Sequence, residues 1–590
     1  MKGVLDFRRA HYLARLSIFL IMAALVAGMV GCDSGFAPGP CPYGPPSENL
    51  EIQTWYDLDA VRHNLAGHHT LMNDLDSTTA GYEELASPTA NGGEGWEPIG
   101  FFYEAPFRGS LDGGEYQIRD LFINRPDQDN AVGLFGCVYE TGVIKDIGVV
   151  NFTVAGCVWV GVLVGDNDGF VVNCYCTMGN VTGDWDVGGL AGYKFRGTVS
   201  NSYYNYDEVL INRQPVITVG ALFNEGFGEW LNNDKFLDVN ERLSQEDGYY
   251  VVNNVKDFKE LLAFGQDGTL RFRLINDLDL AGEPNFYIPY LAGEFDGNGH
   301  RISNLSFDFS FVSQVGLFGQ VASDGTVHDM AAENINITAR RRVGGLVGWN
   351  RGDVSDSYST GRVTGAEHVG GLVGVNDGAV SNSCSTGSVT GEDFIGGLVG
   401  SNGDYGAVSN SYSTGNVTGE EGVGGLVGLN RRGTVSNSYS SGSVAGGYAV
   451  GGLAGGNAGE VSDCYSTGSV TGEDFIGGLM GTSGKGSTVS NCYSTGSVTC
   501  AGRDCLWVGG LVGATGDYGP VSNSFWDVET SGQASSDGGT GKTAAEMQDI
   551  ATFSGAGWSI VAVANPDTRD PSHIWNMVGG QTYPILSWET

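Results

Sequence analysis

The chain has 590 residues, 96 of them glycine, and its 30 basic and 68 acidic side chains give a formal charge of −38 at pH 7. A net charge of this sign repels nucleic acid and anionic lipid, which excludes both as partners and leaves polycations, divalent metals and neutral glycans. Large apolar residues recur at fixed intervals among the glycines, which excludes a flexible low-complexity chain and indicates a fold with many tight corners.

Residues 1–31 are predicted to be an export signal. Four basic side chains precede the apolar run LSIFLIMAALVAGMV, which is shorter than the ~20 residues that a membrane-spanning helix needs. The sequence Met-Val-Gly-Cys that ends at Cys32 resembles a bacterial lipobox, and the resemblance implies that Cys32 is lipidated; ordinary cleavage is the alternative. We therefore expect an exported protein that only a lipid anchor holds to a membrane, at the cell surface or in the periplasm.

The next three segments are expected to form a linker, a first module and its closing segment. Residues 32–50 are rich in glycine and proline and are predicted to be flexible. Residues 51–205 are predicted to form a short β-solenoid, which begins with a capping helix in WYDLDAVRHNLAG and continues through two or three coils. Residues 206–250 contain more large and charged side chains and are predicted to close this module.

Residues 251–524 repeat the same plan at greater length. LINDLDL from Leu274 matches LMNDLDS from Leu71, and a short capping helix is again expected, in VKDFKELLAFG. The motif Gly-Gly-Leu then occurs seven times at intervals of 26 to 32 residues without a helical period, which indicates one coil per repeat and about eight coils. The first glycines of the motif are Gly344, Gly370, Gly396, Gly424, Gly451, Gly477 and Gly509.

Several positions of the repeat are predicted to face the core. The position of Val423 is always Val or Ile, that of Leu426 is always Leu, and that of Val435 is always Val. Because Gly-Gly separates the first two, we expect a bend that brings both inside. Side chains alternate along a strand, so Asn437 and Tyr439 are also expected to point inward, Asn437 within an amide ladder that runs from coil to coil.

Acidic pairs occupy the same corner of three coils. Stacked carboxylates repel one another, and Ca²⁺ would relieve this repulsion with hard oxygen ligands. A solvated acidic edge is the favoured alternative, because Gly447 and Tyr448 interrupt the column and no GGxGxD repeat is present; no other cofactor is expected. The pairs are Glu392 with Asp393, Glu420 with Glu421, and Glu473 with Asp474.

An exported chain can form disulfides, and one pair of cysteines is close in sequence. Cys500 and Cys505 lie in TCAGRDC, an insertion between two coils, and are predicted to pair. Cys464 and Cys492 occupy the same repeat position in successive coils, where buried thiols are favoured over a disulfide.

Residues 525–590 contain four tryptophans and are predicted to form a C-terminal cap. The recurrent GGL[VAM]G followed by VSNSYSTGxVTG, the LINDLDL and FDGNGHRI segments before it, and the ETSG and YPILSW segments after it resemble the GLUG-motif repeat proteins of bacterial and archaeal surfaces. The resemblance implies an all-β, right-handed parallel β-helix, here as two tandem solenoid modules with short capping helices. It also implies an exported, adhesin-like protein and no shared catalytic residue.

The favoured functional hypothesis is a non-enzymatic, lipid-anchored scaffold that binds glycans or partner proteins through many shallow contacts. Outward aromatic side chains are the candidate stacking surfaces for sugars. They are Trp349, Tyr405, Tyr448 and Trp507.

The alternative hypothesis is a polysaccharide lyase or glycoside hydrolase on the same scaffold. FDGNGH, which ends at His300, offers an acid and a histidine, but Asp-Gly and Asn-Gly are also strong turn formers. A glycosidase needs two carboxylates about 5 to 10 Å apart in a groove. No pair of acids in the sequence stands out from its neighbours, so the sequence favours a binding protein without deciding the question.

Overall fold

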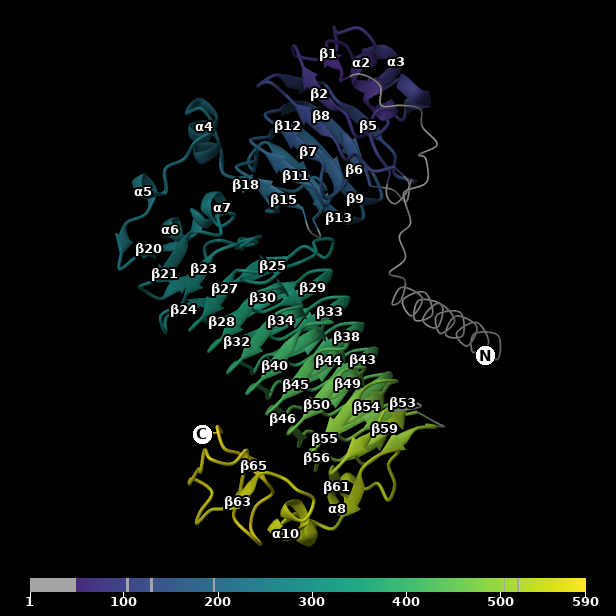
Figure 1. Ribbon diagram of the computed structural model, residues 1–590, viewed down its shortest axis with the longest axis vertical. Helices are drawn as coiled ribbons and strands as arrows, with labels where there is room; N and C mark the ends of the chain where they lie inside the picture. The colour runs from purple at the N-terminus through teal and green to yellow at the C-terminus, as the bar shows by residue number, and fades with distance from the viewer. Residues whose placement is uncertain are drawn as a thin grey trace, which may run out of the picture. The chain divides into compact units, whose positions relative to one another are not determined.

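Parallel strands dominate the chain, and most pair with the strand one coil before and the strand one coil after (Figure 1). The computed structural model describes residues 49–101, 105–127, 131–194, 197–502, 505–516 and 519–589. The predicted export signal, its Cys32 and nearly all of the predicted linker lie outside the described residues. Within these residues the predicted all-β parallel solenoid is confirmed.

One coil of the second module shows how the repeat folds. β31 (Asp353–Ser355), β32 (Tyr358–Thr364), β33 (Glu367–Gly370) and β34 (Val373–Asn376) follow one another around the coil. Each belongs to a different parallel sheet. We call these sheets face A (β31, twelve strands), face B (β32, seventeen strands), face C (β33, seven strands) and face D (β34, eight strands).

Both modules contain more coils than the repeats predict. The first has a six-stranded sheet that runs from β1 (Glu51–Ile52) to β15 (Thr198–Ser200). In the second, β20 (Tyr249–Val252), β21 (Arg271–Leu274) and β23 (Glu294–Asp296) already stack in register on face A. The predicted coil numbers were too low because these early coils lack the Gly-Gly-Leu motif.

Short helices cap the modules. Thr54 and Asp57 form a capping box at the first helix, whose Trp55 is fully buried, and the Asn254 side chain caps the equivalent helix of the second module. The helices are α2 (Trp55–Ala60), α3 (Tyr82–Leu85), α4 (Asn224–Asn232), α5 (Val239–Arg242), α6 (Val255–Lys259), α7 (Leu261–Phe264), α8 (Val528–Ser531), α9 (Ala544–Met547) and α10 (Ile550–Ser554). Among the described residues, none is long and apolar enough to cross a membrane.

The predicted core positions are confirmed. Val423, Leu426 and Val435 are buried, and so are their equivalents in the other coils except the half-buried Val508 and Val521 of the last coil. The predicted bend lies between β43 (Glu421–Gly424) and β44 (Val427–Asn430). A Cβ atom on Gly424 would lie only 2.0 Å from the Val427 carbonyl oxygen, so this corner has room only for glycine.

The inward placement of Asn437 and Tyr439 was wrong. Asn437 has a left-handed backbone with φ of 48°, and such a residue reverses the alternation of side chains. Ser438 therefore faces the core, while Tyr439 lies on the outside of face B and Asn437 at the outer corner. Equivalent side chains do bond from coil to coil, as Asn410 Nδ2 does to Asn382 Oδ1 at 3.3 Å, but outside the core.

A different asparagine column forms the buried ladder. Each member follows Gly-Gly-Leu-Val-Gly-x or its variant and ends a strand of face D. The side-chain amides of the first four members donate to the side-chain oxygen one coil on, at 2.8 to 3.0 Å, and also to nearby backbone carbonyls. The last member, Asn457, accepts from Asn430, and its own buried amide nitrogen has no partner among the described residues. The members are Asn350, Asn376, Asn402, Asn430 and Asn457.

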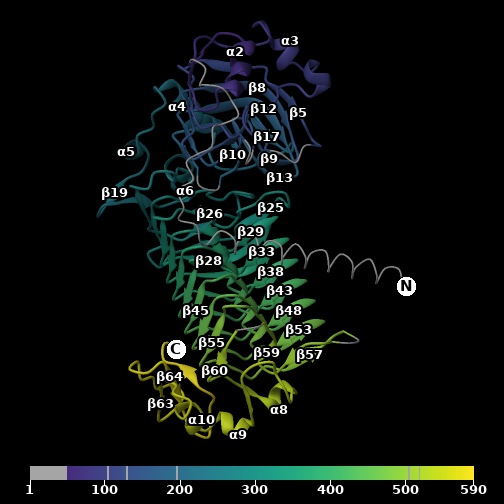
Figure 2. The same cartoon turned by 45° about the vertical axis from the view of Figure 1, so that its right-hand side comes forward.

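The C-terminal segment lies along face B over several coils, beside the later strands of that sheet (Figure 2). The indole nitrogen of Trp588 donates to the Asn437 carbonyl at 2.9 Å, and that of Trp575 to Asp463 Oδ1 at 3.2 Å. These contacts bury the outward tyrosines of the last coils, among them Tyr465, under a second apolar cluster. The C-terminal cap thus covers a row of tyrosines that the sequence pattern had predicted to point into the core.

The two modules have separate sheets but contact each other. Among the described strands, none of the first module pairs with one of the second, whose sheets begin at β19 (Gln245–Glu246). The closing segment contributes to both: α4 packs Trp230 on Tyr203 of the first module, while β19 pairs with β20 of the second. Tyr203 in turn donates to the Ala263 carbonyl of the second module at 2.8 Å. Residues Glu48–Thr590 form one compact unit.

Candidate functional site

Trp349 is not an outward stacking surface, contrary to the prediction. Only 2% of it is exposed, although it lies on the outer side of β30 (Val347–Asn350). The guanidinium groups of Arg342 and Arg351 lie 4.6 and 5.4 Å from its ring centroid. Its indole nitrogen donates to Asp377 Oδ2 at 2.8 Å. A large ring at an outward position recruits long basic side chains, and these remove it from solvent.

Tyr405 and Trp507 are exposed, but their surroundings differ. Tyr405 is 91% exposed at a coil corner, and no aromatic ring among the described residues contacts it. Trp507 is 46% exposed, follows the insertion between two coils, and stacks on Phe475 with ring centroids 6.1 Å apart. Isolated Tyr405 offers one ring, whereas Trp507 is part of a larger surface.

Three aromatic rings on successive coils of face C form that larger surface. Tyr448 on β48 (Tyr448–Gly451) contacts Phe475 on β53 (Asp474–Gly477), with centroids 4.7 Å apart, and Phe475 contacts Trp507. Leu506 beside them is 74% exposed. We call Tyr448, Phe475, Leu506 and Trp507 the aromatic surface. Two of its members were predicted, and the repeated Asp-Phe-Ile-Gly-Gly was the missed signal for Phe475.

The backbone under this surface follows the pattern of the whole repeat. Phe475 has φ of 54°, and the equivalent Phe394 and Ala449 have φ of 60° and 54°, in a region that bulky residues avoid at a cost of about 1–2 kcal/mol. The left-handed residue places its side chain outside the coil, and His368 in this position stacks on Phe394 with ring centroids 5.1 Å apart. The conformation therefore belongs to the coil, and the aromatic side chains distinguish this surface.

A disulfide closes the loop that leads to the aromatic surface. The structure contains the predicted bond between Cys500 and Cys505, whose Cα atoms are 6.1 Å apart. Leu506 and Trp507 follow directly after Cys505. Cys464 and Cys492 are buried free thiols.

The predicted acidic residues lie next to the aromatic surface. Asp393, Glu421 and Asp474 belong to a register column of face C in which Tyr448 takes the place of an acid, as Glu421↔Tyr448↔Asp474 shows. Glu392, Glu420 and Glu473 lie one residue earlier, exposed at the coil corners. At the start of the column Arg341 pairs with Glu367 at 3.0 Å. The possible binding of calcium by these acidic pairs stays a prediction.

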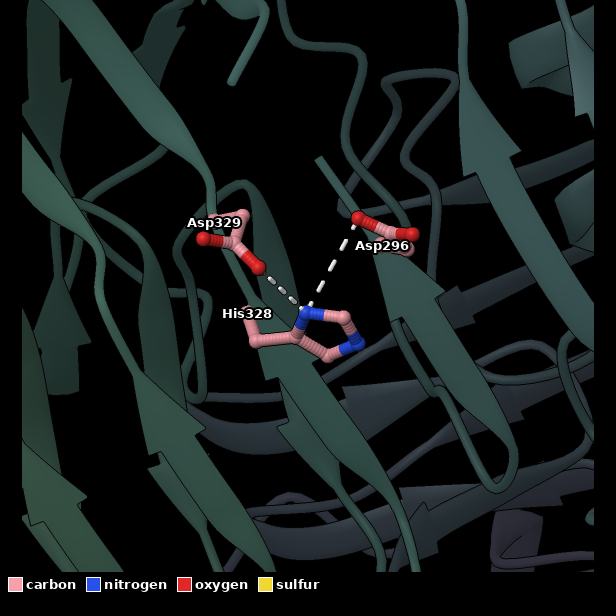
Figure 3. A group of neighbouring side chains, drawn as sticks. All are labelled: Asp296, His328 and Asp329. Atoms are coloured by element: carbon pink, nitrogen blue, oxygen red, sulfur yellow. Dashed lines mark hydrogen bonds and ion pairs between the residues drawn. The ribbon is translucent and has the colours of Figure 1, made fainter. Parts of the chain in front are cut away.

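Among the described residues, one group of three places potential metal ligands close together. Asp296, His328 and Asp329 each offer a ligand atom within 4.8 Å of the others, and Figure 3 shows the His328 ring between the two carboxylates. His328 Nδ1 lies 2.8 Å from Asp329 Oδ2 and 3.8 Å from Asp296 Oδ1. The group lies on the outer side of face A, on β23 and β27 (Thr326–His328).

Ion pairs already satisfy this group. Arg273 Nε lies 2.7 Å from Asp296 Oδ2, and Arg271 Nε lies 2.7 Å from Glu294 Oε2. Hydrogen bonds from Arg271 and Tyr249 outweigh burial and lower the pKa of Glu294 to about 2. Glu294 is therefore ionised and cannot act as a general acid near neutral pH.

His328 completes this network. Burial opposes its charged form, but hydrogen bonds to Asp329 and Glu294 raise its pKa above the ordinary value. A metal ion at the group would meet the Arg273 guanidinium at close range, and the His328 ring whenever it is protonated. The geometry favours a structural ion-pair network over a metal or catalytic centre.

FDGNGH is a turn that supplies Asp296 to this network. Asp296 Oδ1 accepts a hydrogen bond from the Asn298 backbone N–H at 2.7 Å, and Asn298 and Gly299 have φ of 52° and 75°. His300 pairs instead with Asp277 at 3.2 Å. The favoured turn interpretation of the sequence matches this geometry.

Comparison with known proteins adds a family motif. The GLUG motif model matches residues 339–364, 395–418, 419–445 and 446–471, each of which spans about one coil. Halomucin of Haloquadratum walsbyi is 32% identical over 152 residues, 25% of this chain and 2% of that protein. A candidate Gly-rich membrane protein of Evansella cellulosilytica is 34% identical over 172 residues, 28% of this chain and 18% of that protein.

One solved structure is also similar. A candidate immunoglobulin A1 protease of Bacteroides ovatus shares 20% identity, with 59% of this chain and 96% of that chain covered and a TM-score of 0.34. A similarity this distant carries no argument about activity. The motif matches show that four coils of the second module are GLUG-motif repeats.

Proposed function

We propose that this chain is a non-enzymatic scaffold at the cell surface, anchored by a lipid on Cys32, whose aromatic surface binds extracellular glycans. The observation that carries the proposal is the contact of Tyr448 with Phe475 and of Phe475 with Trp507 across three successive coils. Partner proteins are the alternative ligands, and the test below separates them.

The chemistry of the aromatic surface suits sugar rings. The apolar faces of pyranose rings pack on aromatic side chains, and a row of such rings lets several sugar units bind at once. The acidic column beside the rings offers carboxylate oxygens to sugar hydroxyls, since Glu421 and Asp474 flank Tyr448 in register. Each contact is shallow, so affinity depends on their number.

The proposed location rests on the N-terminal sequence and on the relatives. The lipobox-like Met-Val-Gly-Cys supports export and lipidation at Cys32. One relative is named a membrane protein. Both matched relatives are much longer than the shared segment, so their own activities supply no further support.

The alternative, a polysaccharide lyase or glycoside hydrolase, lacks support at the group of Asp296, His328 and Asp329. Ion pairs hold Glu294 and Asp296 there, and the lowered pKa of Glu294 removes the proton that a general acid would donate. We therefore keep the enzyme as an outcome of the test.

The test combines a glycan array with a polysaccharide hydrolysis panel on the purified exported chain. We expect saturable binding to at least one glycan, no release of reducing or unsaturated ends, and a loss of roughly tenfold or more in affinity for Phe475→Ala. Tyr405→Ala is the matched control, because it removes one exposed ring outside the aromatic surface. Equal losses in both variants, binding to proteins alone, or product release would contradict the proposal.

A further inference from the structure

A pocket of about 450 Å³ lies where the two solenoid modules meet. The first module contributes Lys194 and Thr198 to its lining, and the second contributes Tyr290, Gln320 and Arg351. A smaller cavity of about 60 Å³ shares Lys194 and Gln320 with it. The larger volume lies in the range of about 300–1,000 Å³ that is typical of small-molecule sites.

Lys194 is a buried lysine with no anionic partner among the described residues. Only 8% of it is exposed, and its ammonium nitrogen lies 3.4 Å from the centroid of the Tyr290 ring. Among the described residues, no carboxylate lies within 4.0 Å of this nitrogen. The Tyr290 ring compensates part of the charge, but a buried ammonium normally has a paired anion. The chain has 68 acidic residues and only 30 basic ones, so a lysine without a carboxylate partner is unexpected.

The remaining lining selects the kind of anion. The rim carries the exposed Ser323 and Asp324, and the buried Gln320 adds an amide. Asp324 can accept hydrogen bonds from hydroxyl groups and repels a doubly charged anion more strongly than a singly charged one. In the smaller cavity the Ser313 hydroxyl is buried without a hydrogen-bond partner among the described residues, which leaves a further polar atom for a ligand or water.

We propose that this pocket binds a sugar that carries a single carboxylate, such as a uronic acid, with the Lys194 ammonium paired to the carboxylate and the rim groups bonded to the hydroxyls. The pocket lies apart from the aromatic surface, so this inference stands or falls independently of the proposed function.

Titration calorimetry on the full exported chain tests the proposal with glucuronate, glucose and inorganic phosphate as probes. We expect glucuronate to bind saturably in roughly the millimolar range, and at least about tenfold more tightly than glucose or phosphate. Lys194→Met should lower the glucuronate affinity about tenfold or more, since it keeps the length of the side chain and removes its charge. Lys485→Met, which removes an exposed lysine elsewhere, should leave the affinity unchanged.

Several results would overturn the proposal. They are no saturable heat with glucuronate, equal affinity for glucose or phosphate, or equal loss in the two lysine variants. Urea midpoints of both variants establish that each is folded before its affinity is compared.

Proton uptake on the unaltered chain gives a second measurement that needs no variant. Burial, with a contribution from Arg351, lowers the pKa of Lys194 to about 7. A bound carboxylate favours the ammonium and raises this pKa, so binding above pH 7 should take up protons and binding near pH 5.5 should not. Among the described residues, the other ionisable groups that line this space are Arg351, Asp324 and Tyr290 and, at the smaller cavity, Asp186 and Tyr287. Glucuronate binding with no proton uptake above pH 7 would contradict the role of Lys194.

Discussion

Replacing Gly424 with alanine places a methyl group in the tight bend between faces C and D. The new Cβ atom would lie 2.0 Å from the Val427 carbonyl oxygen, 2.7 Å from the Gly455 nitrogen and 2.8 Å from the Ala454 Cα atom. All three are backbone atoms, so no side-chain rotation relieves the overlap, and the strands of two coils must move. Overpacking a core costs about 1–3 kcal/mol even where side chains yield, and we expect about 3 kcal/mol or more here.

Gly456→Ala is the matched control for this prediction. It lies in the next coil, and the nearest atoms to its Cβ are side-chain atoms, Leu429 Cδ1 at 3.0 Å and Thr482 Oγ1 at 3.6 Å. We expect a change within about 0.5 kcal/mol. The assay is the urea midpoint followed by circular dichroism, compared at equal slope. Similar urea midpoints for the two variants would refute the argument that glycine is required at position 424 because there is no space for a Cβ atom.

Three further predictions follow from the ladder, the ion pairs and the disulfide. Asn402→Ala should lower the free energy of unfolding by about 1–3 kcal/mol in urea, because it breaks the buried asparagine ladder. The control is Asn416→Ala, which removes an exposed asparagine and should leave the stability unchanged. Equal effects of the two variants would contradict the ladder's role. Glu294 has a pKa of about 2 against an ordinary 4.5, so its stabilisation is complete above pH 4.5 and is lost as the pH falls toward 2. The urea midpoint of Glu294→Gln should therefore fall less over that range than that of the unaltered chain, and parallel curves would contradict this. Mass spectrometry after alkylation should label Cys500 in Cys505→Ser and not in the unaltered chain, where labelling would contradict the disulfide.

The sequence predicted the fold well because the repeat is a spatial period. Each Gly-Gly-Leu motif marks one coil, and the invariant Val and Leu positions can only be a core. The coils before Gly344 were missed because they stack through Phe272 and Phe295 without the motif.

The candidate site was predicted less well because strand alternation fails at left-handed residues. Asn437 reverses the pattern, so Tyr439 was assigned to the wrong side, and the same device brings Phe475 to the surface. Trp349 was misplaced for another reason: its outward direction was right, but Arg342 and Arg351 of the same coil cover its ring. The alternation of side chains along one strand does not show which long side chains of the neighbouring strand and turn will fold over it.

The most direct test of the stacked-coil account is the excision of one whole coil, residues 370–395. Gly370 and Gly396 are partners in register, so the deletion joins Val369 to Gly396 and leaves the aromatic surface intact. We predict a folded protein with unchanged strand content by circular dichroism, a cooperative urea transition and unaltered glycan binding. Loss of the strand signal, or of cooperative unfolding, would contradict the claim that each repeat is one interchangeable coil.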